Sequence, residues 1–245
     1  MSINLHYTRE ILEELNYVAT WFPTTTLAPG EVCDMRGGQL KPVGSLEDFD
    51  ITFETEPGSA ESTIEYKSAG AVSIKTKAAG SAELPGSALK EAEAGLHITF
   101  ARENAILLTL TGCEARRIAR LHQVGQQVLA KHNEGAWPKG YVVVTEALTC
   151  GASTILVASS DNAAIDLSAK GAFGAMALTL ANANAGLEMR TESNIGFRTI
   201  SSPGLTPLLR TSGIVPRFLR PDEFRGGAEE ADVDFAAVSY DDLEE

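Results

Sequence analysis

The chain lacks the motifs that mark many enzyme classes. Its 245 residues contain no glycine-rich phosphate-binding loop, no HExxH metal motif and no GxSxG nucleophile motif. No apolar run approaches the roughly 18 residues that a membrane-spanning helix needs. The first ten residues carry His6, Arg9 and Glu10 and have no apolar core, so they do not form a secretory signal. We therefore expect a cytoplasmic protein.

Cysteine is scarce and widely spaced. Cys33, Cys113 and Cys150 form no CxxC pair, and their odd number argues against a disulfide framework or a structural zinc site. We expect three buried, reduced thiols and neither metal nor cofactor. One catalytic hypothesis remains, in which Cys113 heads a helix that also carries His122 and His132, as in a hydrolase with a thiol nucleophile.

Basic residues are in short supply, and the charge is uneven. The chain has 20 Lys and Arg against 33 Asp and Glu, for a net charge of −13. Residues 221–245 alone hold ten acidic residues and one arginine, so the rest is close to neutral. Nucleic-acid binding needs a basic face, and we exclude nucleic acid as a partner. The acidic tail is either a solvated segment or a cover for a basic surface.

What is present is a mixture of strand and helix patterns without a βαβ rhythm. Residues 96–110 predict a hairpin that turns at 102–104, and Tyr141–Thr145 predicts a strand buried on both faces. Residues 114–132 have helical spacing instead. The fold class is therefore α+β, with a twisted, mainly antiparallel sheet flanked by a few helices.

Three regions follow from this pattern. We expect a single α+β body over residues 1–200, a basic, proline-containing exit segment over 201–220, and an acidic tail over 221–245. The helix predicted over 114–132 carries Arg116, Arg117 and Arg120 near its start, where positive charge opposes the helix dipole. These arginines are either a solvated face or candidates to face an anionic lipid surface.

Short motifs resemble those of the gasdermin family. Residues 140–148, GYVVVTEAL, resemble the YVVTE-L strand of gasdermin pore-forming domains, which lies at a similar distance along the chain and also follows a helix. Ile195–Arg198, IGFR, resembles the late apolar-x-F-R strand of the family. Residues 27–53, with Pro29-Gly30 and a strand expected after Leu46, resemble the segment before the family's first long strands. The similarity covers about residues 1–200.

The resemblance implies an autoinhibited pore-forming protein of bacterial cell-death defence against viruses. Animal gasdermins carry a separate repressor domain, whereas only a short tail follows residue 200 here, as in the compact bacterial members. Bacterial members often carry an acylated cysteine near the N-terminus, and no cysteine precedes Cys33 here. The implied partners are an activating protease, an anionic lipid membrane after cleavage, and further copies of the chain, with movement from the cytoplasm to the inner membrane.

The same interpretation assigns roles to the C-terminal region and to two long segments. Segments 62–111 and 163–197 are each long enough to refold into membrane-spanning hairpins, although both also suit an ordinary soluble sheet. The cleavage candidates are Arg217, Arg220 and Arg225, and the apolar anchors of the inhibitory tail are Phe235, Val238, Tyr240 and Leu243.

Two other functional classes stay open. The chain fits a soluble, non-enzymatic binding or immunity module whose acidic tail docks on a partner, and it fits the Cys113 hydrolase. Leakage of liposomes before and after limited proteolysis distinguishes the pore-forming protein from both.

The domain boundaries predict where a protease cuts first. Limited trypsin digestion of the folded chain should cut initially at Arg217, Arg220 or Arg225, because an extended, charged segment is accessible to a protease. Mass spectrometry of the early fragments identifies the site. A first cut inside residues 114–132 would contradict this boundary.

Overall fold

A computed structural model describes residues 2–21, 26–35, 40–59, 61–169, 178–200, 203–216 and 233–238. These residues form mainly antiparallel sheets and three α-helices, which confirms the α+β class. The chain divides into two compact units. Unit 1 comprises Met1–Tyr7, Ser59–Glu114 and Thr149–Leu205, and unit 2 comprises Thr8–Gly58, Ala115–Leu148 and Thr206–Glu245. Helix α1 (Ile3–Leu15) is divided between the units at Tyr7.

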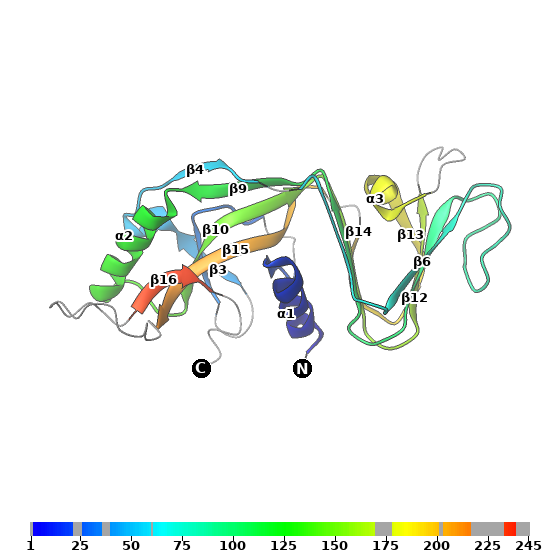
Figure 1. Ribbon diagram of the computed structural model, residues 1–245, viewed down its shortest axis with the longest axis horizontal. Helices are drawn as coiled ribbons and strands as arrows, with labels where there is room; N and C mark the ends of the chain where they lie inside the picture. Colours follow the sequence, from blue (N-terminus) through cyan, green and yellow to red (C-terminus); the bar gives the residue numbers. More distant parts are fainter. Residues whose placement is uncertain are drawn as a thin grey trace. The chain divides into compact units, whose positions relative to one another are not determined.

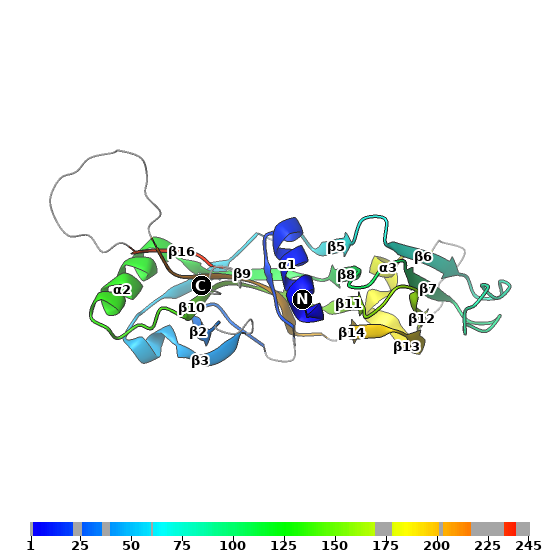
Figure 2. The same ribbon diagram turned by 90° about the horizontal axis from the view of Figure 1, so that it is seen from below.

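Unit 1 is a four-stranded sheet that folds back on itself. One half has the strand order β14-β11-β8-β5 and the other half has the order β13-β12-β7-β6. Each strand of one half continues through a short bend into the corresponding strand of the other, so both halves keep the same order (Figures 1 and 2). The strands are β5 (Thr63–Lys67), β6 (Val72–Lys77), β7 (Gly95–Phe100), β8 (Ile106–Thr111), β11 (Ala152–Ala158), β12 (Ala163–Ala169), β13 (Leu187–Ser193) and β14 (Ile195–Ile200).

The bends share one backbone conformation. In each bend one residue has a positive φ, a region that glycine enters freely and asparagine tolerates better than most residues. Hydrogen bonds link the bends side by side, from Asn104 N to Ala158 O at 2.9 Å and from Ser159 N to Asn194 O at 2.8 Å. The four residues are Gly70, Asn104, Asn162 and Asn194, with φ values of 65°, 59°, 58° and 55°.

The space inside the folded sheet holds the core of unit 1. Helix α3 (Leu180–Ala183) and the 3-10 helix η2 (Asn184–Gly186) pack there, and Figure 1 shows α3 between the two halves. Buried Asn184 donates to Thr109 O and to Thr111 Oγ1, both at 3.2 Å, which fixes this segment on β8. The apolar residues of the core include Leu96, Ile98, Phe100, Leu107, Leu156, Ile165, Leu167, Leu178 and Leu180.

A buried carboxylate pins the loop 78–94 onto unit 1. Asp166 accepts hydrogen bonds from Ala88 N at 2.6 Å and Ser87 Oγ at 2.8 Å, and its Oδ1 lies 2.7 Å from His97 Nδ1. Burial alone would raise the pKa of Asp166, but these hydrogen bonds together with one from Thr191 hold it below its ordinary value. The loop is therefore held by a charged group that stays ionised.

Unit 2 is built on an eight-stranded sheet. Its central path runs β1-β15-β10-β2-β3; in addition β9 pairs with β10 and β4, and β16 pairs with β15. Helix α2 (Leu121–Asn133) and the 3-10 helix η1 (Leu46–Phe49) complete the unit. The strands are β1 (Val18–Ala19), β2 (Glu31–Asp34), β3 (Lys41–Ser45), β4 (Glu54–Pro57), β9 (Glu114–Ala119), β10 (Tyr141–Cys150), β15 (Leu205–Pro216) and β16 (Val233–Ala237).

Strand β10 is buried on both faces, as the run Tyr141–Thr145 predicts. Val142 and Val144 belong to one apolar cluster, with Leu27, Met35 and Leu209 among its members. Val143 belongs to a second cluster, which contains Val124 and Val128 of α2. The alternation of a strand sends neighbouring side chains to opposite faces, so β10 separates two cores.

The structure corrects three local predictions. Residues 96–100 and 106–110 are strands but not a hairpin, because β7 pairs with β6 and β12 while β8 pairs with β5 and β11. The helix predicted over 114–132 is wrong in its first part, where β9 pairs with β4. No strand follows Leu46 directly, since η1 forms there and the next strand begins at Glu54. Pairing with distant strands decided the first two cases, whereas η1 is held by a local hydrogen bond from Ser45 N to Asp48 Oδ2 at 2.8 Å.

Within the predicted exit segment 201–220, residues 205–216 form a strand. Strand β15 occupies Leu205–Pro216 and pairs with β10 along one edge and with β1 and β16 along the other. Leu208 and Leu209 are buried. Residues 205–216 are therefore part of the unit 2 sheet.

The burial of β10 predicts a strong effect of charge at Val143. Val143→Asp should prevent accumulation of soluble protein, because an unpaired carboxylate in the core costs several kcal/mol. That cost is comparable to the whole free energy of unfolding of a domain, about 5–15 kcal/mol. Val43→Asp is the matched control, since the Val43 side chain on β3 is 45% exposed. Expression and thermal melting of both variants test this. Wild-type melting of Val143→Asp would contradict the burial of β10.

Candidate functional site

The candidate site is the place where the C-terminal strand docks on unit 2. Strand β16 pairs antiparallel with the distal half of β15, with Ala237 opposite Ser212 and Phe235 opposite Ile214. Figure 1 shows β16 beside β15 and close to α2. Part of the acidic tail thus forms an edge strand of the sheet.

Phe235 lies on the α2 side of the sheet. It packs half-buried against the cluster that contains Val124, Val128 and Ile214. A Cβ atom placed on Gly125 would lie 2.8 Å from Phe235 Cδ1, so the ring rests directly on the glycine backbone. Glycine in a helix interior costs about 1 kcal/mol relative to alanine. At Gly125 the missing side chain makes room for the tail.

Val238 lies on the opposite side of the sheet. It is 3% exposed and belongs to the cluster of Val142, Val144 and Leu209. Thr211 Oγ1 donates to Val238 O at 2.6 Å, and Val238 N donates to Thr211 O at 3.2 Å. Residues 235 and 238 differ by an odd number, so the docked strand places one side chain in each of the two cores.

Two of the residues predicted in the acidic tail lie in this site. Phe235 and Val238 were predicted as tail anchors, and each packs in one of the two apolar clusters of unit 2. The other predicted residues of this region, Tyr240, Leu243, Arg217, Arg220 and Arg225, lie outside the described residues. Gly125 and Thr211 were missed. A glycine inside an otherwise helical pattern was the available signal for Gly125, since such a residue usually has a packing reason.

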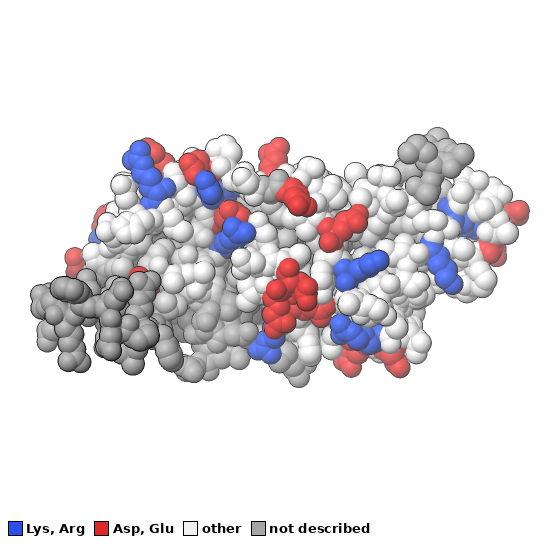
Figure 3. Space-filling view, in the orientation of Figure 1, with Lys and Arg blue, Asp and Glu red and all other residues white. Residues whose placement is uncertain are grey.

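The three arginines predicted at a helix start lie in other positions. Arg116 and Arg117 are exposed residues of β9, and only Arg120 adjoins α2, where it is the N-cap with φ 52°. Arg117 Nη2 forms an ion pair with Glu56 Oε1 at 2.8 Å, and Arg116 Nη1 donates to Thr55 Oγ1 at 3.2 Å. Acidic β4 therefore offsets part of this positive charge. Figure 3 likewise shows basic and acidic side chains interspersed on the face in view.

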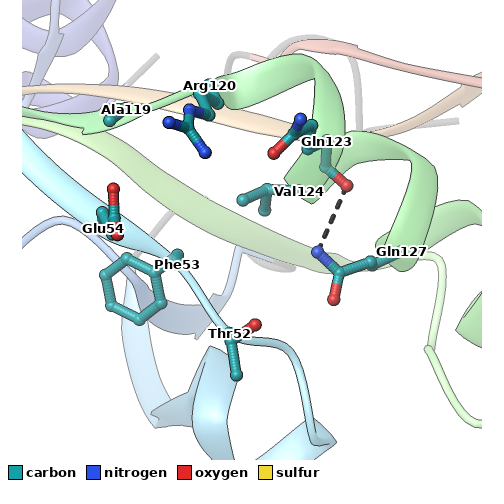
Figure 4. Close-up of a pocket in the computed structure, with 8 residues that line it drawn as sticks. All are labelled: Thr52, Phe53, Glu54, Ala119, Arg120, Gln123, Val124 and Gln127. Atoms are coloured by element: carbon teal, nitrogen blue, oxygen red, sulfur yellow. Dashed lines mark hydrogen bonds between the residues drawn. The ribbon is translucent and has the colours of Figure 1, made fainter.

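A hollow of about 300 Å³ lies between β4 and the start of α2. Figure 4 shows Arg120, Gln123 and Gln127 on the α2 side, and Phe53 and Glu54 on the other side. Gln127 Nε2 donates to Gln123 O at 3.3 Å. The hollow combines one arginine with one carboxylate, so its electrostatics favour neither anions nor cations.

Arg210 is the member of the basic segment that the structure describes. Its guanidinium lies 4.6 Å from the centre of the Tyr17 ring, and its Nη1 lies 3.8 Å from Glu146 Oε1. Tyr17 Oη also donates to Glu146 Oε1 at 3.1 Å. This interaction ties β15 to β10 and leaves Arg210 with a structural role.

The geometry gives the Cys113 hydrolase little support. Cys113 precedes strand β9 and does not head a helix, so a helix N-terminus does not activate its thiol. Its Sγ lies 3.1 Å from Cys150 Sγ. His132 Nδ1 lies 2.9 Å from Trp137 O, and His122 is exposed on α2. Among the described residues, no group of His, Cys, Asp and Glu is arranged to hold a metal ion.

The docking geometry predicts coupling between Gly125 and Phe235. Gly125→Ala should destabilise the wild-type protein or displace β16, because the new methyl group meets the Phe235 ring. In a Phe235→Ala background the same change should stabilise the protein by about 1 kcal/mol, from helix propensity alone. Urea unfolding of the four proteins and hydrogen exchange at residues 233–238 measure the cycle. The same effect of Gly125→Ala in both backgrounds would show that Phe235 does not rest on Gly125.

Comparisons with known proteins assign no family to the chain. No protein-family model matches the chain, and no curated protein matches it. Within the described part of the chain, no helix is both long and apolar enough to cross a membrane. The docked strand and the folded sheet are therefore the features that bear on function.

Proposed function

We propose that the chain is a gasdermin-like, autoinhibited pore-forming protein that removal of its C-terminal tail activates, in bacterial cell-death defence. The observation that carries this proposal is the docked strand β16. Phe235 of β16 and Val238, the residue that follows the strand, enter the two cores of unit 2, and the strand follows a segment that contains Arg217, Arg220 and Arg225. A cut in that segment would leave β16 held by non-covalent contacts alone.

The size of these contacts suits a removable inhibitor. Burial of Val238 contributes roughly 1.5–3 kcal/mol to the docking of the tail. Phe235 is half-buried and contributes somewhat less. The strand pairing adds a few backbone hydrogen bonds of about 1 kcal/mol each. While the chain is intact, the linkage keeps the local concentration of β16 high. After cleavage, dilution favours its release.

The folded sheet of unit 1 supports the membrane step. Segments 63–77 and 95–111 form one bent hairpin, and 152–169 and 187–200 form a second. Each bent strand, if straightened, exceeds the roughly 9–11 residues that a membrane-spanning strand needs. The bends are local, at Gly70, Asn104, Asn162 and Asn194. A change of backbone conformation at four bends would therefore produce two long hairpins.

Charge supports the order of events. Loss of residues 221–245 removes most of the net negative charge and leaves a body close to neutral. Anionic lipids attract basic groups at about 1 kcal/mol per residue near the surface. Arg116 is the first candidate for this contact, because Glu56 partly neutralises Arg117 and Glu54 lines the same hollow as Arg120. Several copies would then assemble in the membrane.

A cleavable variant tests the proposal. The recognition sequence of a site-specific protease replaces residues 224–230, and the matched control carries the same residues in scrambled order. Vesicles contain either phosphatidylglycerol with phosphatidylcholine or phosphatidylcholine alone, and they hold a self-quenching dye. Protease treatment should cause the cleavable variant to release dye from the anionic vesicles. Raised salt should weaken the first contact, because surface charge is screened within about 10 Å at 0.1 M salt.

Two outcomes would contradict the proposal. Release of dye by the uncleaved protein would show that β16 does not inhibit. A cleaved protein that loses residues 233–245, stays monomeric and is inert toward both vesicle types would exclude a pore-forming protein. In that case the soluble binding module, whose acidic tail docks on a partner, becomes the better explanation.

A further inference from the structure

Two cysteines of unit 1 lie side by side. Cys113 Sγ and Cys150 Sγ are 3.1 Å apart, and the two residues are 7% and 3% exposed. The third cysteine, Cys33, belongs to unit 2 and is fully buried in an apolar cluster. The pair is separated by 37 positions in the sequence, so the tertiary fold alone brings the two thiols together.

The backbone holds the two residues in place. Strands β8 and β11 pair with Thr111 opposite Ala152, and Cys113 and Cys150 continue this register two residues further on. Between them, Gly151 N donates to Thr111 O at 3.0 Å and to Gly112 O at 3.1 Å. A Cβ atom on Gly112 would lie only 3.5 Å from Gly151 Cα. The two glycines thus allow the close approach of the chains.

Neighbouring segments fix the same two residues from outside. Cys113 N donates to Ser62 O at 3.1 Å, and Gly204 N donates to Cys150 O at 3.0 Å. Gly112, Glu114 and Gly151 are exposed, so the thiols lie just beneath the surface. A small oxidant therefore has a short path to them.

The two thiols are chemically different. The hydrogen bond from Cys150 lowers the pKa of Cys113, and the same hydrogen bond together with burial raises the pKa of Cys150. Burial and the charge of Glu31 raise the pKa of Cys33 to about 12. Because the thiolate is the reactive form, Cys113 is the thiol that reacts first with an oxidant.

We propose that Cys113 and Cys150 form a reversible disulfide when the protein meets hydrogen peroxide. The Cys113 thiolate attacks a peroxide oxygen, and the O–O bond breaks, giving a sulfenic acid and hydroxide, which takes up a proton to become water. The Cys150 thiol then attacks Cys113 Sγ, loses its proton and displaces a second water. In total, two thiols and one hydrogen peroxide give one disulfide and two waters.

The position of the pair in the chain gives the disulfide its consequence. Ala115–Leu148, the segment of unit 2 that contains α2 and most of β9 and β10, leaves unit 1 next to Cys113 and returns next to Cys150. A disulfide bond between the two cysteines closes a covalent loop that contains this segment, and it links the ends of β8 and β11. Oxidation therefore opposes separation of these strands, whatever the activity of the protein.

Intact-mass and peptide analysis tests the disulfide on the full-length folded protein. Hydrogen peroxide should lower the intact mass by about 2 Da, the two hydrogen atoms removed, and dithiothreitol should restore it. Peptide mapping without reduction should join Cys113 to Cys150. Cys33→Ser, the matched control, should behave like wild type, whereas Cys150→Ser should stop at the sulfenic acid of Cys113. Cys33 should react at least about tenfold more slowly than the pair.

Hydrogen exchange separately tests the effect of this link on β8 and β11. In the oxidised protein, amides of residues 107–113 and 150–157 should exchange more slowly than in the reduced protein, and Cys33→Ser should show the same slowing. The proposal fails if wild-type protein keeps three free thiols at peroxide concentrations that oxidise a free cysteine peptide, or if the bond found involves Cys33 or a second chain. Unchanged exchange after complete oxidation would overturn the effect on β8 and β11.

Discussion

The architecture of unit 2 depends on one constraint, the burial of strand β10 on both faces. Three successive valines, Val142 to Val144, lie in two different apolar clusters, so both faces of the sheet must be covered. Helix α2 covers one face. On the other face Val238 of the C-terminal segment completes the cluster. Residues 233–238 are thus a structural part of unit 2, and their removal exposes apolar surface on both sides of the sheet.

This arrangement connects stability to regulation. Phe235 of β16 and the adjacent Val238 contribute to two cores and stabilise the resting protein, yet among the described strands β16 pairs with β15 alone. A strand at the edge of a sheet is opened at a lower free-energy cost than a central strand. Gly125, which has no side chain, leaves space for the Phe235 ring. Thr211 donates a hydrogen bond from its hydroxyl group to Val238 O. The proposed proteolytic activation would release β16, a strand at the edge of the unit 2 sheet.

Unit 1 follows a different principle, in which a single sheet supplies both layers around a core. The four bends lie side by side and use residues that tolerate positive φ, so the two halves keep the same strand order. The hydrogen-bonded carboxylate of Asp166 and the buried amide of Asn184 then fix the surrounding loops. The Cys113–Cys150 pair lies at the end of the β8–β11 ladder, where the chain enters and leaves unit 1.

The sequence by itself determined the fold class, the strand character of residues 96–100 and 106–110 and the double burial of β10, because these depend on local alternation and on β-branched runs. It also identified Phe235 and Val238, as apolar residues in an acidic tail. Tertiary structure decided which strands pair. Residues 96–110 alternate like a hairpin, yet a bend sends β7 and β8 into different halves of the sheet. Residues 114–119 have helical spacing, yet pairing with β4 makes them a strand. Long-range hydrogen bonds and packing, which local patterns do not encode, outweigh these local preferences.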